Sequence, residues 1–255
     1  MGRGQILDYI HNGGLTWMMP RHRNEVLLVT SRVLGIDPLN PMELTRAEIE
    51  GRVQVWEIAD FFKKYVPGCE NSYIAESNIH IGVRASRRIA GIATLTADDA
   101  MNFNKYSDSI AKASWDIDIW PGDSYTAPAV ERDTVQYRDR CERLKYGDYF
   151  DIRYGCIVAK GIDNMLMAGR CISAEHIAQS SIRIQQTCMA TGEAAGIAAA
   201  LSIKENVVPS KLEPTKVVKL LKERNDKVEP AFTVIGDIWK RFATKANSVM
   251  KASEN

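Results

Sequence analysis

The sequence carries almost no net charge and lacks the residue spacings of several common functional sites. Its 33 lysines and arginines nearly balance its 32 aspartates and glutamates, so the formal net charge is +1. A nucleic-acid-binding protein normally carries a basic stripe, so we expect no nucleic-acid partner. There is no G-x-S-x-G elbow and no phosphate loop. The histidines show no metal-ligand spacing, so no metal site is expected; they are His11, His22, His80 and His176.

Paired cysteines and long apolar runs are also missing. The five cysteines are scattered, odd in number and without a C-x-x-C pair; they are Cys69, Cys141, Cys156, Cys171 and Cys188. This pattern favours free thiols in a reducing cytosol over a disulfide framework. The N-terminal residues MGRGQILDYIHNGG contain no apolar signal core, and no later run is long enough to cross a bilayer. We therefore expect a cytoplasmic protein without a membrane partner.

Length and composition allow a substantial core. At 255 residues with 45% hydrophobic content, the chain can form one large domain or two. Local patterns predict strands at residues 25–34, 72–82, 89–95 and 115–120. They predict a core helix capped by Thr45 and ended by Pro67, with Ile49, Val53 and Trp56 at helical spacing. Further helices are expected after Thr96, at residues 6–11 and at residues 215–224.

Two segments have no clear pattern or admit two interpretations. Residues 121–148 are rich in charge and contain prolines, which favours a solvated insertion; a lid or a partner contact is the alternative. Residues 230–255 carry apolar side chains at helical spacing with basic residues around them. This tail is expected to be a helix docked on its own domain, or else a contact with a partner subunit.

The most informative stretch runs from Asp163 to Leu201. It begins with a short apolar strand at residues 165–168, bounded by Gly161 and Gly169. From about Ser181 the pattern becomes helical, and alanine and glycine dominate its second half. Such a helix has little side-chain bulk, so another backbone or a flat ligand can come close. Its first turn leaves N–H groups unpaired with the positive end of the dipole behind them.

These residues carry a resemblance to a known family. DNMLMAGRCIS, then His176, then SSIRIQQTCMATGEAAGIAAA resembles the closing segment of the FAD-dependent oxidoreductases that end in a DNLLVAGRCIS-type strand and a TCMAxGxAAGxAAA-type helix. LTRAEIEGRVQVWEIADFFKKYVPG and IGVRASRRIAGIATLT are similar to the substrate-domain core of the same family. Together these segments cover about residues 26–200.

The resemblance implies an α+β fold. It predicts a mixed β-sheet substrate domain with packed helices, plus the C-terminal strand and helix of a glutathione-reductase-like FAD-binding fold. Residues 1–150 would form the substrate domain with an N-terminal arm, residues 151–205 the flavin-closing strand and helix, and residues 206–255 a helical tail.

The family's opening motif is not found. That motif is a βαβ unit with G-x-G-x-x-G for the ADP half of FAD, whereas here Gly2 and Gly4 are followed by Leu7, and no strand precedes them. The chain is therefore expected to be the second half of an enzyme: a subunit that acts in a hetero-oligomer with a separate chain holding the ADP half. A non-catalytic scaffold or regulatory subunit, and a truncated fragment, are the alternatives.

The resemblance also implies which residues would contact FAD. Hydride arriving at flavin N5 builds negative charge over N1 and the C2 carbonyl. The helix start at Ser181, with the backbone N–H groups of Ile182 and Arg183, would place positive partial charge there. Gly169 would let the chain pass close to the ribityl or diphosphate region, and Arg170 would bond its oxygens. Cys171 completes this set; it and Cys188 are expected to be small buried residues rather than redox partners.

Residues for the substrate follow from the same comparison. His176 is the acid/base candidate because its intrinsic pKa is close to neutral. Arg84 and Arg87 match the family's GxRESRR run and would orient a small organic substrate, with Arg87 counted among the catalytic residues. Pairing with the chain's own acids is the structural alternative, and Ala85 stands where the family has Glu.

One further substrate residue is inferred from a displaced charge. In DIRYGCIVA, compared with an IPYRCLVP-like strand, Arg153 replaces a proline and Gly155 replaces an arginine. A shift of two residues along a strand keeps the same face. Arg153 is therefore assigned to the substrate-binding set in place of the missing arginine.

Overall fold

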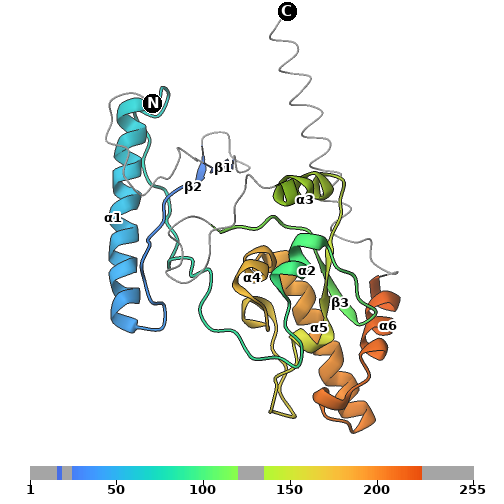
Figure 1. Cartoon of the computed structure of the whole chain (residues 1–255). Coiled ribbons are helices and arrows are strands. Elements are labelled where there is room, and N and C mark those ends of the chain that lie inside the picture. Colours follow the sequence, from blue (N-terminus) through green and yellow to red (C-terminus); the bar gives the residue numbers. More distant parts are fainter. Residues whose placement is uncertain (1–15, 19–24, 120–134, 226–255) are drawn as a thin grey trace, which may run out of the picture. The chain divides into compact units, whose positions relative to one another are not determined.

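The computed structural model describes residues 16–18, 25–119 and 135–225 (Figure 1). The chain divides into two compact units between Ser86 and Arg87, and each is treated by itself. The predicted helices at residues 6–11 and 230–255, and the first half of the predicted insertion at residues 121–148, lie outside the described residues. The functional division into substrate domain, closing segment and tail stays a prediction.

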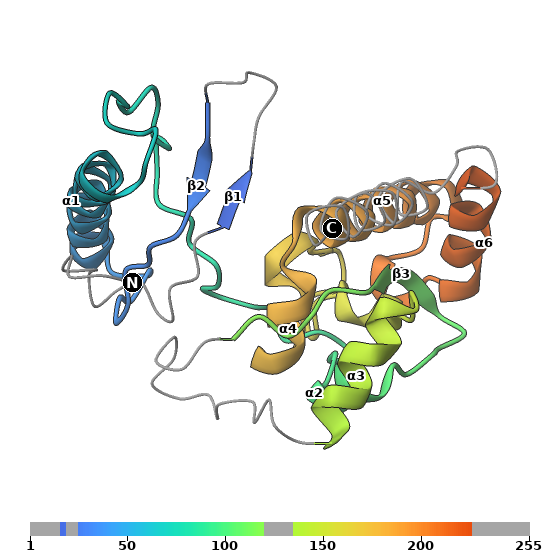
Figure 2. The same ribbon diagram turned by 90° about the horizontal axis from the view of Figure 1, so that it is seen from above.

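The first unit consists of one long helix and a small strand pair. Strand β1 (Thr16–Met18) pairs antiparallel with β2 (Leu27–Val29), with Trp17 opposite Leu28 (Figure 2). Only three residues of the strand predicted at 25–34 join this ladder. Residues 72–82, also predicted as a strand, form no ladder. They form a loop instead. The Arg52 guanidinium of the long helix donates to the Ile79 carbonyl of this loop at 2.9 Å.

Helix α1 (Pro41–Tyr65) begins earlier than the predicted capping box. Asn40 is the N-cap, and its side-chain oxygen accepts the Met42 N–H at 3.0 Å. Proline at the first helical position lacks the N–H that would be unpaired there. Thr45 lies inside the helix, and its hydroxyl donates to the Pro41 carbonyl. The predicted end is confirmed, since the helix stops at Tyr65, just before Pro67.

The prediction that the apolar stripe of α1 is its buried side is wrong. Ile49, Val53 and Trp56 are exposed, and the buried residues of α1 are Ala47, Gln54, Ile58 and Phe62. Helical spacing therefore identified a real stripe on α1, but within the first unit the opposite side of the helix packs inward.

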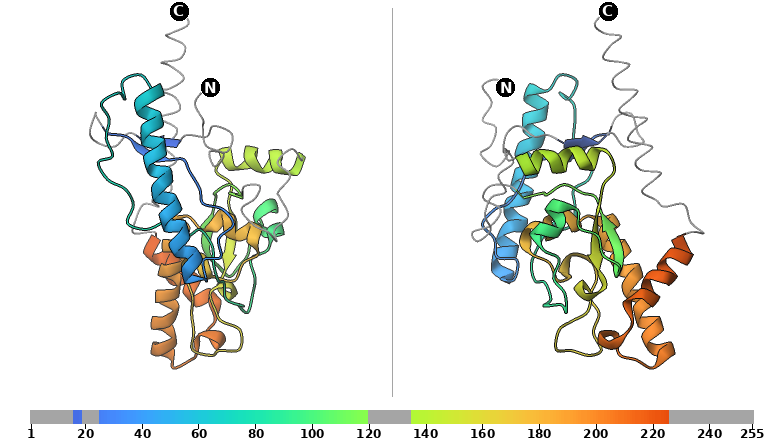
Figure 3. Two further views of the ribbon diagram at one scale, coloured as in Figure 1. Left: turned by 90° about the vertical axis from the view of Figure 1, so that its left-hand side faces the viewer. Right: turned by 45° about the vertical axis from the view of Figure 1, so that its right-hand side comes forward.

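The second unit is built on a two-stranded antiparallel sheet. Strand β3 (Ser109–Ala113) pairs with β4 (Phe150–Arg153). Helix α5 (Gln185–Glu205) packs against β3, and α6 (Pro214–Asn225) lies beside α5 (Figure 3). Helices α2 (Ala97–Asn102) and α4 (His176–Ile182) pack against each other. The shared core contains Phe150, Ile152, Ile157, Ile172, Ile182, Ala194, Ala198 and Val217.

The α+β class is confirmed, but the described residues contain no mixed sheet. Their two sheets are both antiparallel pairs. The strand predicted at residues 89–95 makes isolated bridges, Gly91 to Ala159 and Leu95 to Ala174, of which the second is parallel. The strand predicted at 165–168 likewise makes one bridge, from Leu166 to Val158.

Three local predictions in the second unit have clear outcomes. Thr96 caps α2, and Asp99 completes the capping box by accepting the Thr96 N–H at 2.8 Å. Helix α6 covers the predicted residues 215–224. Helix α3 (Val135–Lys145), in contrast, was not predicted, because its charged sequence was interpreted as a solvated insertion.

Candidate functional site

The turn after the predicted closing strand is held against α5. The 3-10 turn Gly169–Cys171 begins at a residue with φ of 78°, a left-handed conformation that favours glycine. The Gly169 N–H donates to the Thr191 hydroxyl on α5 at 3.0 Å. A side chain at Gly169 would meet Cys188 at an ordinary 3.8 Å. Glycine is therefore required by the backbone conformation rather than by lack of space.

The helix that follows begins four residues later than predicted. Ser181 and Ile182 lie in the last turn of α4, and Arg183 caps it. Ile184 is extended, with φ of −73° and ψ of 154°, so a new helix starts at Gln185. The N–H groups of Ile182 and Arg183 therefore do not lie at a helix start. The donors of the first turn of α5 are instead those of Gln185, Gln186 and Thr187.

This first turn of α5 is suited to a polar ligand atom. Its cap, Ile184, has no side-chain acceptor for the turn's N–H groups, which leaves them for another acceptor. Thr187 is 1% exposed, and its hydroxyl has no hydrogen-bond partner within the described residues. A buried unpaired hydroxyl is costly, so its presence calls for a partner that the described residues do not supply.

Two thiols lie between the turn and α5. The Cys171 thiol donates to the Ala168 carbonyl at 3.2 Å, and the Cys188 thiol contacts the Ile182 carbonyl at 3.8 Å. Burial raises the pKa of Cys188, while the nearby Arg170 opposes that rise. Residues 169–171, the end of α4 and the start of α5 therefore converge around Cys188. Both thiols are free and partly buried.

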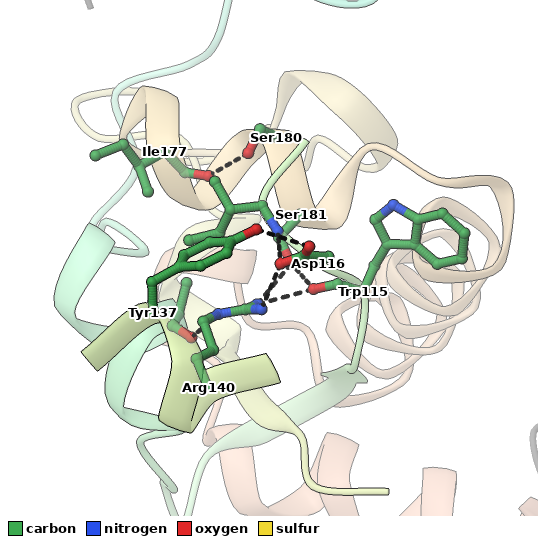
Figure 4. A network of polar contacts seen from close by, with 9 residues as sticks. Trp115, Asp116, Tyr137, Arg140, Ile177, Ser180 and Ser181 are labelled. Atoms are coloured by element: carbon green, nitrogen blue, oxygen red, sulfur yellow. Dashed lines mark hydrogen bonds and ion pairs between the residues drawn. The ribbon is translucent and has the colours of Figure 1, made fainter. Parts of the chain in front are cut away.

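A buried arginine fixes the end of α4 from the other side. Arg140 of α3 is fully buried and donates to the carbonyls of Ala100 at 3.1 Å and Trp115 at 2.8 Å (Figure 4). It also pairs with Asp116 at 3.1 Å and lies 3.5 Å from the Ser181 hydroxyl. Burial is the main cause that lowers the pKa of Arg140. The Ser181 hydroxyl donates to the Trp115 carbonyl at 2.5 Å, so it serves this network.

Two arginines that were predicted as site residues, Arg183 and Arg153, have acidic partners within the second unit. Arg183 donates to the Asp118 carbonyl and lies 3.3 Å from its carboxylate. Arg153 pairs with Asp108 at 3.1 Å, and this bond is the main cause that raises the pKa of Arg153. Arg153 therefore has an acidic partner of its own, and its assignment to the substrate-binding set stays a prediction.

Comparison with known protein families gives a match over most of the chain. Residues 4–221 match the family described as FAD dependent oxidoreductase. The chain belongs to this family. Searches among curated proteins and among solved structures gave no match. Membership supports an oxidoreductase role and FAD binding as general properties of FAD dependent oxidoreductases.

In this FAD dependent oxidoreductase, the three predicted substrate residues lie in different parts of the structure. His176 is the first residue of α4 and is partly buried. The cap before it, Glu175, accepts the Ala97 N–H at 2.7 Å and so ties α4 to α2. Arg87 is exposed in the second unit, and Arg84 is exposed in the first. Two of these residues, His176 and Arg87, therefore belong to the second unit and Arg84 belongs to the first, and their roles stay predictions.

Sequence reasoning missed Arg140, Thr187 and the true start of α5. Arg140 lies in a charged run, and only tertiary contacts reveal its burial. For Thr187 and the start of α5 no local signal existed, since the run from Ser181 to Gln186 contains no proline or glycine. Across the described part of the chain, no group of three or more His, Cys, Asp or Glu could hold a metal ion. No helix there is long and apolar enough to cross a bilayer.

Proposed function

We propose that this chain is a subunit of a split FAD-dependent oxidoreductase and holds the flavin-ring side of the cofactor. The observation that carries the proposal is the first turn of α5, where Ile184 offers no side-chain cap for the helix N–H groups and the buried Thr187 hydroxyl has no partner within the described residues. The carbonyl and ring nitrogens of a flavin are acceptors of the required kind. The neighbouring residues Gly169 to Cys171 would complete this site.

The chain's own groups would support hydride transfer in three ways. Bound flavin would exchange a hydride at N5 with a small organic substrate. The N–H groups of Gln185 and Gln186, with the helix dipole behind them, would stabilise negative charge at the pyrimidine side of the ring. His176 would take or return the substrate proton, and Arg84 and Arg87 would orient the substrate through its negative charge.

The partner in this proposal supplies what the sequence lacks. A diphosphate is normally received by a glycine-rich turn at a helix N-terminus, and no G-x-G-x-x-G following a strand occurs in these 255 residues. A separate chain would therefore hold the ADP half of FAD. The riboflavin half would be bound by α5 and the Gly169 turn.

A non-catalytic scaffold is the second candidate. Arg153, Arg183 and Ser181 all bond to groups of the second unit itself, which is typical of side chains that hold a fold together. A scaffold would keep these contacts without binding a flavin. Substituting His176 and Arg87 in an assembled complex separates the two candidates, because a scaffold would show unchanged turnover.

The cofactor part of the proposal can be tested on the full chain alone. If the chain contacts only the ring side, riboflavin and FAD should bind with similar, weak affinity, measured by quenching of flavin fluorescence. A complete FAD site would bind FAD far more tightly than riboflavin. The absence of any binding of riboflavin at millimolar protein would contradict the proposal.

A single substitution links the binding to α5. Thr187→Val removes the unpaired hydroxyl while keeping the side-chain shape. We expect about tenfold weaker riboflavin binding, the loss of one hydrogen bond, together with equal or higher thermal stability because a buried unpaired group is removed. Thr215→Val, at an exposed position of α6, is the matched control and should change neither property. Unchanged binding by Thr187→Val would place the flavin elsewhere.

A further inference from the structure

Helix α5 begins at a place that its own residues do not favour. Its cap, Ile184, provides no side-chain acceptor, and the first turn contains no acidic residue to interact with the helix dipole. Thr187 in this turn has a buried hydroxyl without a partner among the described residues. Helices α1 and α2, in contrast, have side-chain caps from Asn40 and Thr96 and acidic residues in their first turns. The start of α5 is therefore weakly supported by the local sequence.

A helix that continued from α4 into α5 would satisfy these same groups. The N–H groups of the first turn would donate to carbonyls four residues earlier, and the Thr187 hydroxyl would find the Arg183 carbonyl at the same spacing. No proline or glycine separates the two helices. Ile184 is nevertheless extended, and the Cys188 N–H makes the first hydrogen bond of α5, to the Ile184 carbonyl at 3.0 Å. Because the break gives up local hydrogen bonds, contacts from another segment have to maintain it.

These contacts come from residues 115–118. The side chain of Arg183, which is 10% exposed, donates to the Asp118 carbonyl at 2.5 Å and lies 3.3 Å from the Asp118 carboxylate. The Ser181 hydroxyl donates to the Trp115 carbonyl at 2.5 Å, and Arg140 donates to that carbonyl from α3 (Figure 4). The contacts of Arg183 with Asp118 and of Ser181 with Trp115 together form an anchor for the helix break.

We propose that Arg183 is a positioning residue for the flavin. Through Asp118 it would hold the chain at the break, and so place the first-turn N–H groups of α5 and the Thr187 hydroxyl against the cofactor. This inference rests on the proposed function. The acceptor atoms of a flavin would complete a helix start that the chain leaves incomplete, and local rules are most often broken in this way at functional sites. The Arg183 side chain would thus act on the cofactor only through α5.

Alkylation of Cys188 by iodoacetamide tests the anchor without any flavin. Cys188 lies at the end of the first turn of α5, and burial raises the pKa of its thiol. Arg183→Leu removes both bonds to Asp118, so the turn should open more often and Cys188 should react about fivefold faster, as mass spectrometry of the full chain would show. Arg183→Lys keeps a cation for the Asp118 carboxylate and should restore most of the slow rate. Arg224→Leu, which removes an ion pair with Glu193 farther along α5, is the matched control and should leave the rate unchanged.

Riboflavin binding then tests what the anchor serves. In fluorescence titrations well below the melting temperature, Arg183→Leu should bind riboflavin about tenfold more weakly, because the first-turn donors lose their fixed position. Arg183→Lys should recover most of this affinity. Gly155→Ala overpacks the core around Ala93 and lowers stability without removing the anchor, so it should bind riboflavin like the unsubstituted chain. A merely structural role for Arg183 predicts equal riboflavin affinity in all these folded variants.

The two measurements separate the positioning role from the proposed function. Unchanged alkylation of Cys188 in Arg183→Leu would overturn the anchor, and faster alkylation with unchanged riboflavin affinity would overturn the positioning role. No riboflavin binding by the unsubstituted chain would overturn the proposed function and the positioning role together, while faster alkylation would still support the anchor. If Arg183→Leu does not fold, Ser181→Ala removes only the bond to Trp115 and should change both properties in the same direction by a smaller factor.

Discussion

Replacing glycine by alanine should have opposite effects at two pairs of positions in the second unit. Gly91 and Gly155 lie close together, and both are tightly packed against Ala93. A Cβ at Gly91 would lie 2.7 Å from the Ala93 carbonyl oxygen and 2.8 Å from that of Gly155. A Cβ at Gly155 would lie 2.7 Å from the Ala93 Cβ. Gly192 and Gly196 of α5 instead face open space.

The size of the effect follows from what would have to move. The atoms around Gly91 belong to backbone that is already hydrogen-bonded, since the Ala93 N–H donates to the Gly155 carbonyl at 3.1 Å. The clash therefore cannot be relieved by rotating a flexible side chain. We expect Gly91→Ala and Gly155→Ala to lower the free energy of unfolding by about 2 to 3 kcal/mol, the upper part of the range for overpacking. The melting temperature should fall by about 5 to 10 °C.

The helix glycines provide the control. Gly192→Ala and Gly196→Ala should raise the free energy of unfolding by about 0.5 to 1 kcal/mol each, because alanine loses less backbone entropy in a helix. Urea unfolding followed by circular dichroism measures both pairs. The reasoning would be refuted if alanine at 155 were as well tolerated as alanine at 196.

Three further predictions concern the contacts around the site. Arg140→Leu should cost about 2 to 4 kcal/mol, because the Ala100 carbonyl loses the Arg140 donor, Asp116 loses its ion pair and the Trp115 carbonyl keeps only Ser181, whereas Arg138→Leu, at an exposed position of α3, should change stability by less than about 0.5 kcal/mol in the same urea assay. Burial alone would raise the pKa of Asp99, but hydrogen bonds from Tyr106, Thr96 and Asn104 outweigh it and lower that pKa below 3.8. The stabilisation by ionised Asp99 is thus present above pH 3.8 and is lost as the pH falls further, so Asp99→Asn should cost about 1 to 2 kcal/mol at neutral pH and progressively less in acid; a constant difference across the acid range would contradict this. Burial raises the pKa of Cys156 to about 11, so at pH 8 only about one thiol in a thousand is ionised, and Cys156 should stay unmodified by iodoacetamide after Cys69 and Cys141 have reacted, as mass spectrometry would show.

Helix ends were predictable where the deciding contacts are local. The Thr96 and Asp99 capping box lies within four residues, and the stop of α1 before Pro67 needs no distant partner. The strands were less predictable, because a ladder needs a second segment. Residues 89–95 and 165–168 have suitable composition, but their neighbours give them only isolated bridges. Composition therefore identified extended segments without identifying their pairing.

The start of α5 was missed for a non-local reason. The run from Ser181 to Gln186 contains no proline or glycine, so nothing in it marks a break. The break at Ile184 accompanies contacts with a distant segment: Ser181 donates to the Trp115 carbonyl, and Arg183 donates to that of Asp118. Arg140 reinforces the same segment from α3. The position of the candidate flavin-binding N–H groups therefore depends on residues 115–118, which no local pattern connects to α5.

Close packing at Gly155 bears on the arginine that the resemblance predicted at this position. The space beside Gly155 is filled by the Ala93 side chain and backbone. An arginine there would have to displace Ala93, whose N–H donates to the Gly155 carbonyl itself. Arg153, two residues earlier, is directed to Asp108. Gly155 is thus coupled to close packing at Ala93, so we expect Gly155→Arg to destabilise the second unit strongly, and the proposed substrate binding is better tested at Arg84, Arg87 and His176.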